Sequence, residues 1–226
     1  MISNSHTLAF DIYGTLFDTG SVVANLRDIA GNKAKEFSLT WRDKQLEYAF
    51  RRGLMQDYEN FGVCTSNALD YTCAFYEIQP SKEQRSLLLD TYNALPIYSD
   101  VEDGLQKLKD KNFRLFAFSN GTERVVNSLL SKSDIRHYFD GIVSVDDVKT
   151  FKPDPLVYRH FMHATDAVIS NTWLISSNTF DIIGAVSSGM RAAWVQRSKK
   201  AIFDPWGIEP TLIVNNLIEL DKIIDY

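Results

Sequence analysis

At 226 residues the chain is long enough to bury a substantial core, either in one large domain or in a domain with a smaller insertion. Its net charge of -5 is opposite to the basic surface that nucleic-acid-binding proteins usually carry, so no nucleic-acid partner is expected. Hydrophobic residues make up 45% of the chain, yet no apolar run approaches the roughly 20 residues that a membrane-spanning helix needs, so no membrane association is expected.

Short apolar runs alternate with helical patterns along most of the chain. The expected strands are residues 7–10, 114–119, 141–145, 172–176, 192–196 and 211–214. Their near-continuous hydrophobicity is typical of a parallel sheet covered on both faces. The expected helices between them are residues 100–111, capped by Ser99 or Asp100, then 122–131, 153–165, and 179–189, which ends at Gly189. This alternation predicts an α/β fold with a doubly wound, Rossmann-like parallel sheet.

Residues 19–95 interrupt the alternation. They contain no convincing strand, but they show helical patterns at 39–59, 66–77 and 82–94. We therefore predict an α/β core domain formed by residues 1–18 and 96–226. A helical cap subdomain, residues 19–95, is inserted after the first strand and ends near Pro96.

The two cysteines, Cys64 and Cys73, have no matching cluster of cysteine or histidine, so their spacing is not that of a zinc site. The first residues lack the basic stretch and apolar run of a secretory signal peptide. Two reduced thiols without such a signal favour a cytoplasmic protein.

Polar residues follow four of the expected strands. These are Asp11, Tyr13 and Thr15; Ser119, Asn120 and Gly121; Lys152; and Ser176, Ser177, Asn178 and Asp181. Taken singly, each has an ordinary explanation: Asp11 as a turn residue, Asp181 as a carboxylate in the first turn of a helix, Lys152 as a surface charge. However, the carboxyl ends of parallel strands share one edge of the sheet, where open α/β sheets bind ligands. Their convergence there favours an active site.

Five segments carry a resemblance to a known family: FDIYGTLFD, WRDKQLEYAF, FSNGT, FKPD with Tyr158, and SSNTFD. They resemble the haloacid dehalogenase superfamily and, within it, the L-2-haloacid dehalogenases, over residues 7–220 including the cap. The resemblance implies a hydrolase that converts L-2-haloalkanoic acids into D-2-hydroxy acids and halide. The reaction would pass through an ester on Asp11, with inversion at C2. The resemblance also implies a homodimer.

Two departures from the superfamily's phosphatases bear on the chemistry. Tyr13 stands where those enzymes have a second aspartate, which protonates the leaving group, and Ser177 stands where they have an acid that helps to bind magnesium. Phosphoryl transfer needs cations against the charge of the phosphoryl oxygens, whereas halide leaves as a stable anion and needs no proton. The sequence therefore predicts a dehalogenase without metal or other cofactor. A phosphatase with a degenerate magnesium site is the alternative, and a catalytically idle binding protein is a third.

The resemblance assigns catalytic roles to Asp11, Thr15, Arg42, Ser119, Lys152, Tyr158, Ser176, Asn178 and Asp181. Asp11 would be the nucleophile and Asp181 the base that activates water. Ser119 and Lys152 would bind the substrate carboxylate, and Lys152 would also keep Asp11 ionised, since a nearby cation favours a carboxylate's charged form.

Substrate-binding roles are implied for Tyr13, Leu46, Phe61, Asn120 and Phe180. Asn120 and Phe180 would cradle the departing halide together with Arg42. The other three would surround the alkyl group of the substrate, although ordinary core packing explains Leu46 equally well.

Overall fold

The computed structural model describes residues 6–223. Its sheet has six parallel strands in the order β3-β2-β1-β4-β5-β6. They are β1 (Thr7–Phe10), β2 (Arg114–Ser119), β3 (Gly141–Ser144), β4 (Thr172–Ser176), β5 (Arg191–Val195) and β6 (Leu212–Val214). The strand order reverses between β1 and β4, so the predicted doubly wound α/β fold is confirmed.

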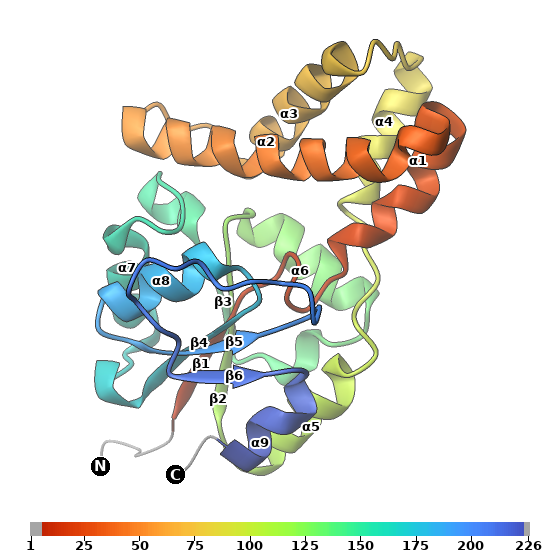
Figure 1. The fold of residues 1–226 in the computed structure, drawn as a ribbon. Helices are drawn as coiled ribbons and strands as arrows, with labels where there is room; N and C mark the ends of the chain where they lie inside the picture. Colours follow the sequence, from red (N-terminus) through yellow and green to blue (C-terminus); the bar gives the residue numbers. More distant parts are fainter. Residues whose placement is uncertain (1–5, 224–226) are drawn as a thin grey trace.

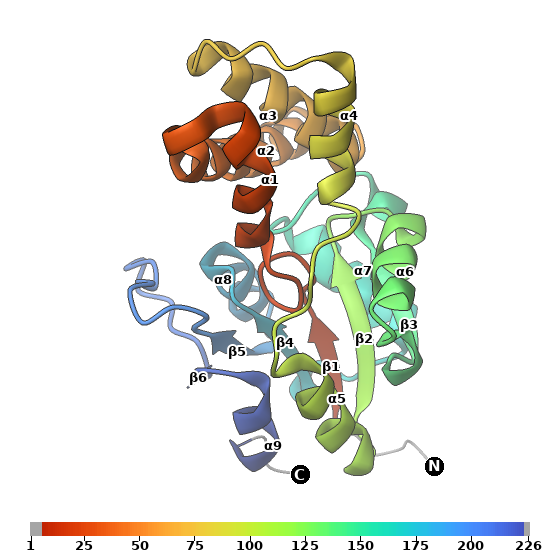
Figure 2. The same cartoon turned by 90° about the vertical axis from the view of Figure 1, so that its right-hand side faces the viewer.

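Helices surround this sheet (Figures 1 and 2). They are α5 (Val101–Asp110), α6 (Glu123–Lys132), α7 (Pro155–Thr165), α8 (Thr179–Ser187) and α9 (Leu220–Ile223). Every residue of β1 and β4 is buried, as expected for central strands that are covered on both faces. The unbroken apolar runs of the sequence are therefore the signature of this arrangement.

Four further helices lie beyond the carboxyl ends of the strands (Figure 1). They are α1 (Val22–Ala30), α2 (Ala34–Met55), α3 (Phe61–Phe75) and α4 (Lys82–Thr91). The chain enters them after β1 and returns to the sheet through α5. No helix in the described part of the chain is long and apolar enough to cross a bilayer.

Some boundaries differ from those predicted. No helix was expected at α1, whose buried residues Val22, Leu26 and Ala30 recur every fourth position and form a short stripe. The helix expected at 39–59 occupies 34–55 instead, because Gln56 adopts a left-handed conformation that ends it. Pro155, two residues beyond the proline that follows Lys152, opens α7.

The register of the central strands determines which residues lie together at the carboxyl edge of the sheet. Phe10 lies opposite Ala117 of β2 and Ile175 of β4. The next residue, Asp11, continues the ladder by donating its backbone N–H to Ile175 O (3.0 Å). Asp11 is therefore level with Ser176, and the polar residues that follow these strands begin at the same edge.

Candidate active site

Asp11 lies at the end of β1 with only 6% of its surface exposed, and its two carboxylate oxygens have different surroundings. Oδ2 accepts hydrogen bonds from Thr15 Oγ1 (2.7 Å), Asn178 Nδ2 (2.7 Å) and Ser176 Oγ (3.4 Å). Within the described residues, Oδ1 accepts only from Lys152 Nζ, at 3.3 Å. The carboxylate is thus anchored through Oδ2, and Oδ1 keeps the freer lone pairs.

The turn after Asp11 is held by the loop that follows β4. Gly14 has φ +86°, a conformation that favours glycine, and its amide donates to Phe17 O (2.8 Å). Ser177 donates its amide to Thr15 Oγ1 (2.8 Å) and its hydroxyl to Gly14 O (2.7 Å). Ser177 therefore orients the Thr15 hydroxyl toward Asp11.

Lys152 is a buried cation, 1% exposed, that joins two carboxylates. Its ammonium group donates to Asp181 Oδ2 (2.8 Å), to the Phe118 carbonyl (2.9 Å) and to Asp11 Oδ1 (3.3 Å). An ammonium group has three N–H donors, so all of them are engaged inside the protein. The expectation that Lys152 also binds the substrate carboxylate is therefore not supported by this geometry.

Asp181, in the first turn of α8, is completely buried. Its Oδ1 accepts from the Tyr158 hydroxyl (2.8 Å), and its Oδ2 from Lys152. Burial raises the pKa of this carboxyl, while the Lys152 charge and the Tyr158 hydrogen bond oppose that increase. A side chain at Gly184, one turn later in α8, would collide with the Tyr158 hydroxyl, so this glycine is needed for the contact.

Ser119 and Asn120 adjoin the cluster without bonding to Asp11. Ser119 Oγ accepts from the Gly121 amide (3.0 Å), which shapes the loop before α6. Asn120 Oδ1 accepts from the Lys152 amide (3.0 Å). This bond leaves the two N–H donors of the Asn120 amide group for another acceptor.

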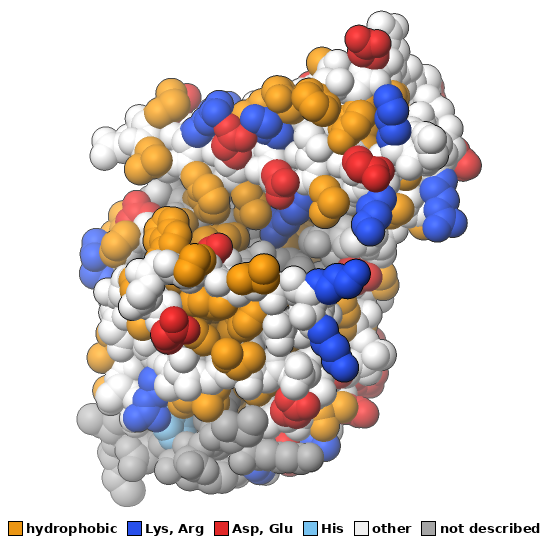
Figure 3. All heavy atoms as spheres, viewed as in Figure 1, with side chains coloured by type: hydrophobic (Ala, Val, Ile, Leu, Met, Phe, Trp, Pro, Cys, Tyr) orange, Lys and Arg blue, Asp and Glu red, His pale blue; other side chains and the backbone are white. Residues whose placement is uncertain are grey.

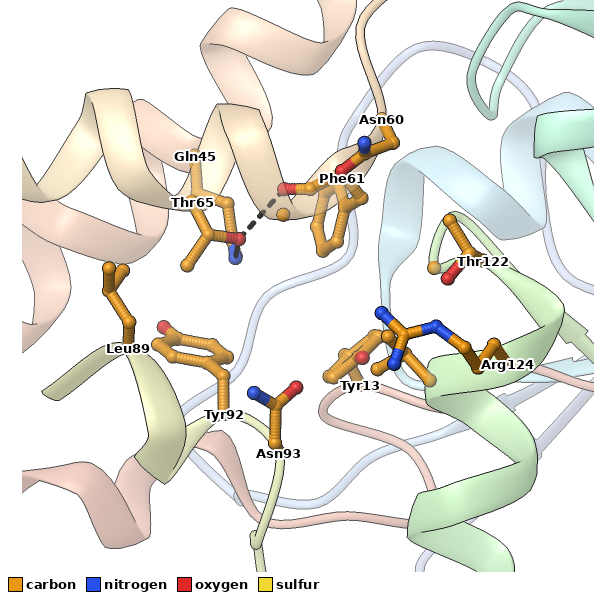
Figure 4. Close-up of a pocket in the computed structure, with 13 residues that line it drawn as sticks. Tyr13, Gln45, Asn60, Phe61, Thr65, Leu89, Tyr92, Asn93, Thr122 and Arg124 are labelled. Atoms are coloured by element: carbon orange, nitrogen blue, oxygen red, sulfur yellow. Dashed lines mark hydrogen bonds between the residues drawn. The ribbon is translucent and has the colours of Figure 1, made fainter. Parts of the chain in front are cut away.

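A cavity of about 270 Å³ lies between the helices above the sheet and the loops below them (Figure 4). Tyr13 and Phe61 line it, with ring centroids 5.7 Å apart. Burial raises the pKa of Tyr13 well above its usual range, and the nearby charge of Arg42 offsets part of that increase. Arg42 reaches this region from α2 and donates to Gln45 Oε1 (2.6 Å). The structure thus brings Arg42, Tyr13 and Phe61 together.

Leu46 and Phe180 do not line this cavity. Leu46 is half-buried on α2, but Gln45, rather than Leu46, is the residue of that turn that lines the cavity. Phe180 packs edge-on against Phe50 of α2, at 5.1 Å, and lines a second, largely apolar cavity of about 710 Å³ together with Lys152. In Figure 3, hydrophobic side chains gather where the upper helices meet the core.

Some residues that support the site were not predicted from the sequence. Arg197 donates to Thr15 O (2.6 and 3.1 Å) and forms an ion pair with Asp100 (2.7 Å). Asp100 therefore binds Arg197 and does not cap α5 with its side chain as expected. Trp194 donates to the Ser177 carbonyl (3.0 Å). No local pattern marks these residues, because each acts through a partner far away in the sequence.

The donor set does not resemble a metal site. Among the described residues, no group of three or more histidine, cysteine, aspartate or glutamate residues lies close enough to share an ion. The two acids of the cluster, Asp11 and Asp181, already share the ammonium group of Lys152. The arrangement suits a carboxylate nucleophile with a second carboxylate beside it.

Known proteins are similar to this chain in sequence and in fold. A (S)-2-haloacid dehalogenase of Pseudomonas sp. (strain YL) is 37% identical over 93% of this chain and 90% of that protein. A crystal structure of a dehalogenase superposes with a TM-score of 0.93 at 29% identity, covering all of both chains. An L-2-haloacid dehalogenase from Xanthobacter autotrophicus with chloropropionic acid covalently bound has a TM-score of 0.88 at 26% identity, over 97% and 98% of the two chains. The family model of haloacid dehalogenase-like hydrolases matches residues 8–195, and the chain belongs to that family.

Proposed function

We propose that this protein hydrolyses L-2-haloalkanoic acids to D-2-hydroxy acids and halide, through an ester on Asp11 and with inversion at C2. The observation that carries the proposal is the asymmetry of Asp11, which is anchored through Oδ2 and leaves Oδ1 for attack. The relatives named (S)-2-haloacid dehalogenase, and the structure described with chloropropionic acid covalently bound, support the same chemistry.

In the first step, Asp11 Oδ1 attacks C2 of the substrate in line with the carbon–halogen bond. The new C2–O bond forms as the old bond breaks, and the halide leaves with the bonding electron pair. Thr15, Asn178 and Ser176 fix the carboxylate plane through Oδ2, so little orientational freedom remains to be lost.

Departing halide needs donors that carry positive charge. We assign this task to Arg42 and to the free amide hydrogens of Asn120. Arg42 is held by Gln45 close to Tyr13, so its charge is already in place before the halide forms. Phe180 stays a predicted member of this cradle, and Leu46 a predicted wall of the alkyl pocket.

The substrate carboxylate lies beside C2 and needs its own donors. With every Lys152 donor engaged, we assign it to the hydroxyl of Ser119 and to backbone amides of the loop before α6. That loop leads into the first turn of the helix, where unpaired amides favour an anion.

The second step releases the product. Water attacks the carbonyl carbon of the Asp11 ester while Asp181 accepts its proton. The bond from that carbon to the product oxygen then breaks, the product oxygen takes the proton that Asp181 accepted, and Asp11 releases the remaining proton of the added water, so both carboxylates are restored. Burial raises the pKa of Asp181, which makes its carboxylate a stronger base than an exposed one. Tyr158 and Lys152 hold both of its oxygens in place.

We also propose a domain division, a cellular location and an oligomeric state for this protein. Residues 19–95 form a cap subdomain over a core of residues 1–18 and 96–226, with the active site between them. The protein is a cytoplasmic homodimer; both of its cysteines are free and buried, as a reducing compartment permits.

Halide release from the two enantiomers of 2-chloropropionate, in excess chelator, tests the reaction. Release from the L enantiomer alone, with D-2-hydroxypropionate as product, is expected. Activity that requires added magnesium would favour the phosphatase instead.

Oxygen tracing tests the covalent route. In heavy-oxygen water, with enzyme in excess, the first product should be unlabelled, because its hydroxyl oxygen comes from Asp11. The label should appear in the peptide of residues 10–18. Labelled product from the first turnover, with Asp11 unlabelled, would show that water attacks C2 directly.

A further inference from the structure

The cavity in Figure 4 adjoins the reacting groups and has room for a substrate chain that extends beyond C2. Its volume of about 270 Å³ is many times the roughly 10–15 Å³ of accessible space that one water molecule needs, so it has room for several heavy atoms of a substrate. Tyr13 and Gly121 line its side next to the reacting groups. Arg124, on the first turn of α6, lines another part of it.

Arg124 carries the one cationic side chain that lines this cavity in the described part of the chain. Its guanidinium extends from α6 toward Tyr13 (Figure 4). No described residue forms a hydrogen bond or an ion pair with it, in contrast to Arg197, which is held by Asp100. The Arg124 charge therefore remains available to a ligand.

The other polar groups of the cavity also suit an anion. Thr122 occupies the N-cap position of α6, and among the described residues its hydroxyl makes no capping hydrogen bond, so it can donate to a ligand. Within residues 6–223, no aspartate or glutamate lines the cavity, and Glu123, which precedes Arg124 in the chain, is not among the lining residues.

An anion at Arg124 cannot be the carboxylate next to C2. That group is bonded directly to the reacting carbon and must stay beside Asp11, which does not line the cavity. Tyr13 lies between the Asp11 cluster and Arg124: its carbonyl bonds Asn178, while its ring faces the cavity. The group at Arg124 is therefore at the far end of the substrate's alkyl chain.

We propose that Arg124 is a specificity-determining residue and that the protein acts preferentially on L-2-halo dicarboxylic acids, whose second carboxylate it binds. This inference rests on the proposed dehalogenase function and adds no new chemical step.

The test compares kcat/KM for halide release from L-2-chlorobutanoate with the values for L-2-chlorosuccinate, L-2-chloroglutarate and L-2-chloroadipate. In the wild type, at least one diacid should exceed the monoacid. Arg124→Gln should reduce that preference by about tenfold, the scale of one charge-assisted hydrogen bond, mainly through KM. Arg124→Lys should restore part of it.

Arg27→Gln on α1 is the matched control, since Arg27 is also exposed and lies outside the cavity. It should leave the preference unchanged. An equal loss with the monoacid and the diacids in Arg124→Gln, or no loss at all, would overturn the inference.

A binding measurement separates the two proposals. If the wild type releases no halide from any substrate, the dehalogenase proposal fails. Calorimetry with unreactive glutarate and butanoate still tests the cavity. Tighter binding of glutarate that is lost in Arg124→Gln supports a diacid site, and equal binding of both acids contradicts it.

Discussion

Replacing Lys152 by methionine removes the cation between two buried carboxylates while keeping a side chain of similar length. The ammonium nitrogen lies 2.8 Å from Asp181 Oδ2 and 3.3 Å from Asp11 Oδ1. At an effective dielectric constant of about 20, these attractions amount to ~6 and ~5 kcal/mol before desolvation is subtracted. Removing one partner of a buried ion pair costs about 3–5 kcal/mol of stability. We expect Lys152→Met to lose that much at neutral pH.

The loss of folding stability in Lys152→Met should depend on pH in a defined direction. Lys152 lowers the pKa of Asp181, and burial raises it. Without the lysine, burial acts unopposed by that charge, so the pKa in the folded state rises further above the unfolded value of about 3.9. The folded state then holds its proton more tightly than the unfolded state. The variant is therefore least impaired at low pH, and its stability falls as pH rises from the unfolded pKa through the folded one.

Urea denaturation at pH 5 and pH 7 measures these effects. A second variant, Lys152→Met with Asp181→Asn, should recover much of the lost stability at pH 7, because a neutral amide replaces the unpaired charge. Turnover should fall in both variants by about 10²-fold or more, the scale of losing one electrostatic stabiliser. A single variant as stable as the wild type at pH 7, with the same pH dependence, would refute this account of Lys152.

Three further predictions concern activity. Arg42→Ala should lower the rate of halide release by about 10²-fold, whereas Arg51→Ala, on the exposed side of the same helix, should not; similar rates would remove Arg42 from the halide site. Asp181→Asn should let the Asp11 ester accumulate, seen by mass spectrometry on the peptide of residues 10–18; an unmodified peptide would argue against Asp181 as the base. Tyr158→Phe removes a hydrogen bond that lowers the pKa of Asp181, so the acidic limb of kcat should move to higher pH, and an unchanged pH profile would contradict that role.

Much of the fold was predictable from the sequence because it depends on local patterns. Apolar runs mark strands buried on both faces, and each predicted strand is present to within one residue at its ends. The rule that parallel strands share an edge then predicts that Asp11 and Ser176 lie at one site, as the strand register shows. Helices were less predictable. The unexpected helix α1 has only three buried residues, and the end of α2 depends on the backbone conformation of Gln56.

Only the tertiary structure decided how the residues of the site divide their contacts. The sequence suggested that Lys152 lies near Asp11. It could not show that Asp181, Phe118 and Asp11 together accept hydrogen bonds from all three N–H groups of its ammonium. Nor could it show which oxygen of Asp11 accepts fewer hydrogen bonds. These outcomes, like the contact between Arg197 and Thr15 O, join groups that are distant in the chain. They depend on ångström-scale packing, which hydrophobic periodicity does not encode.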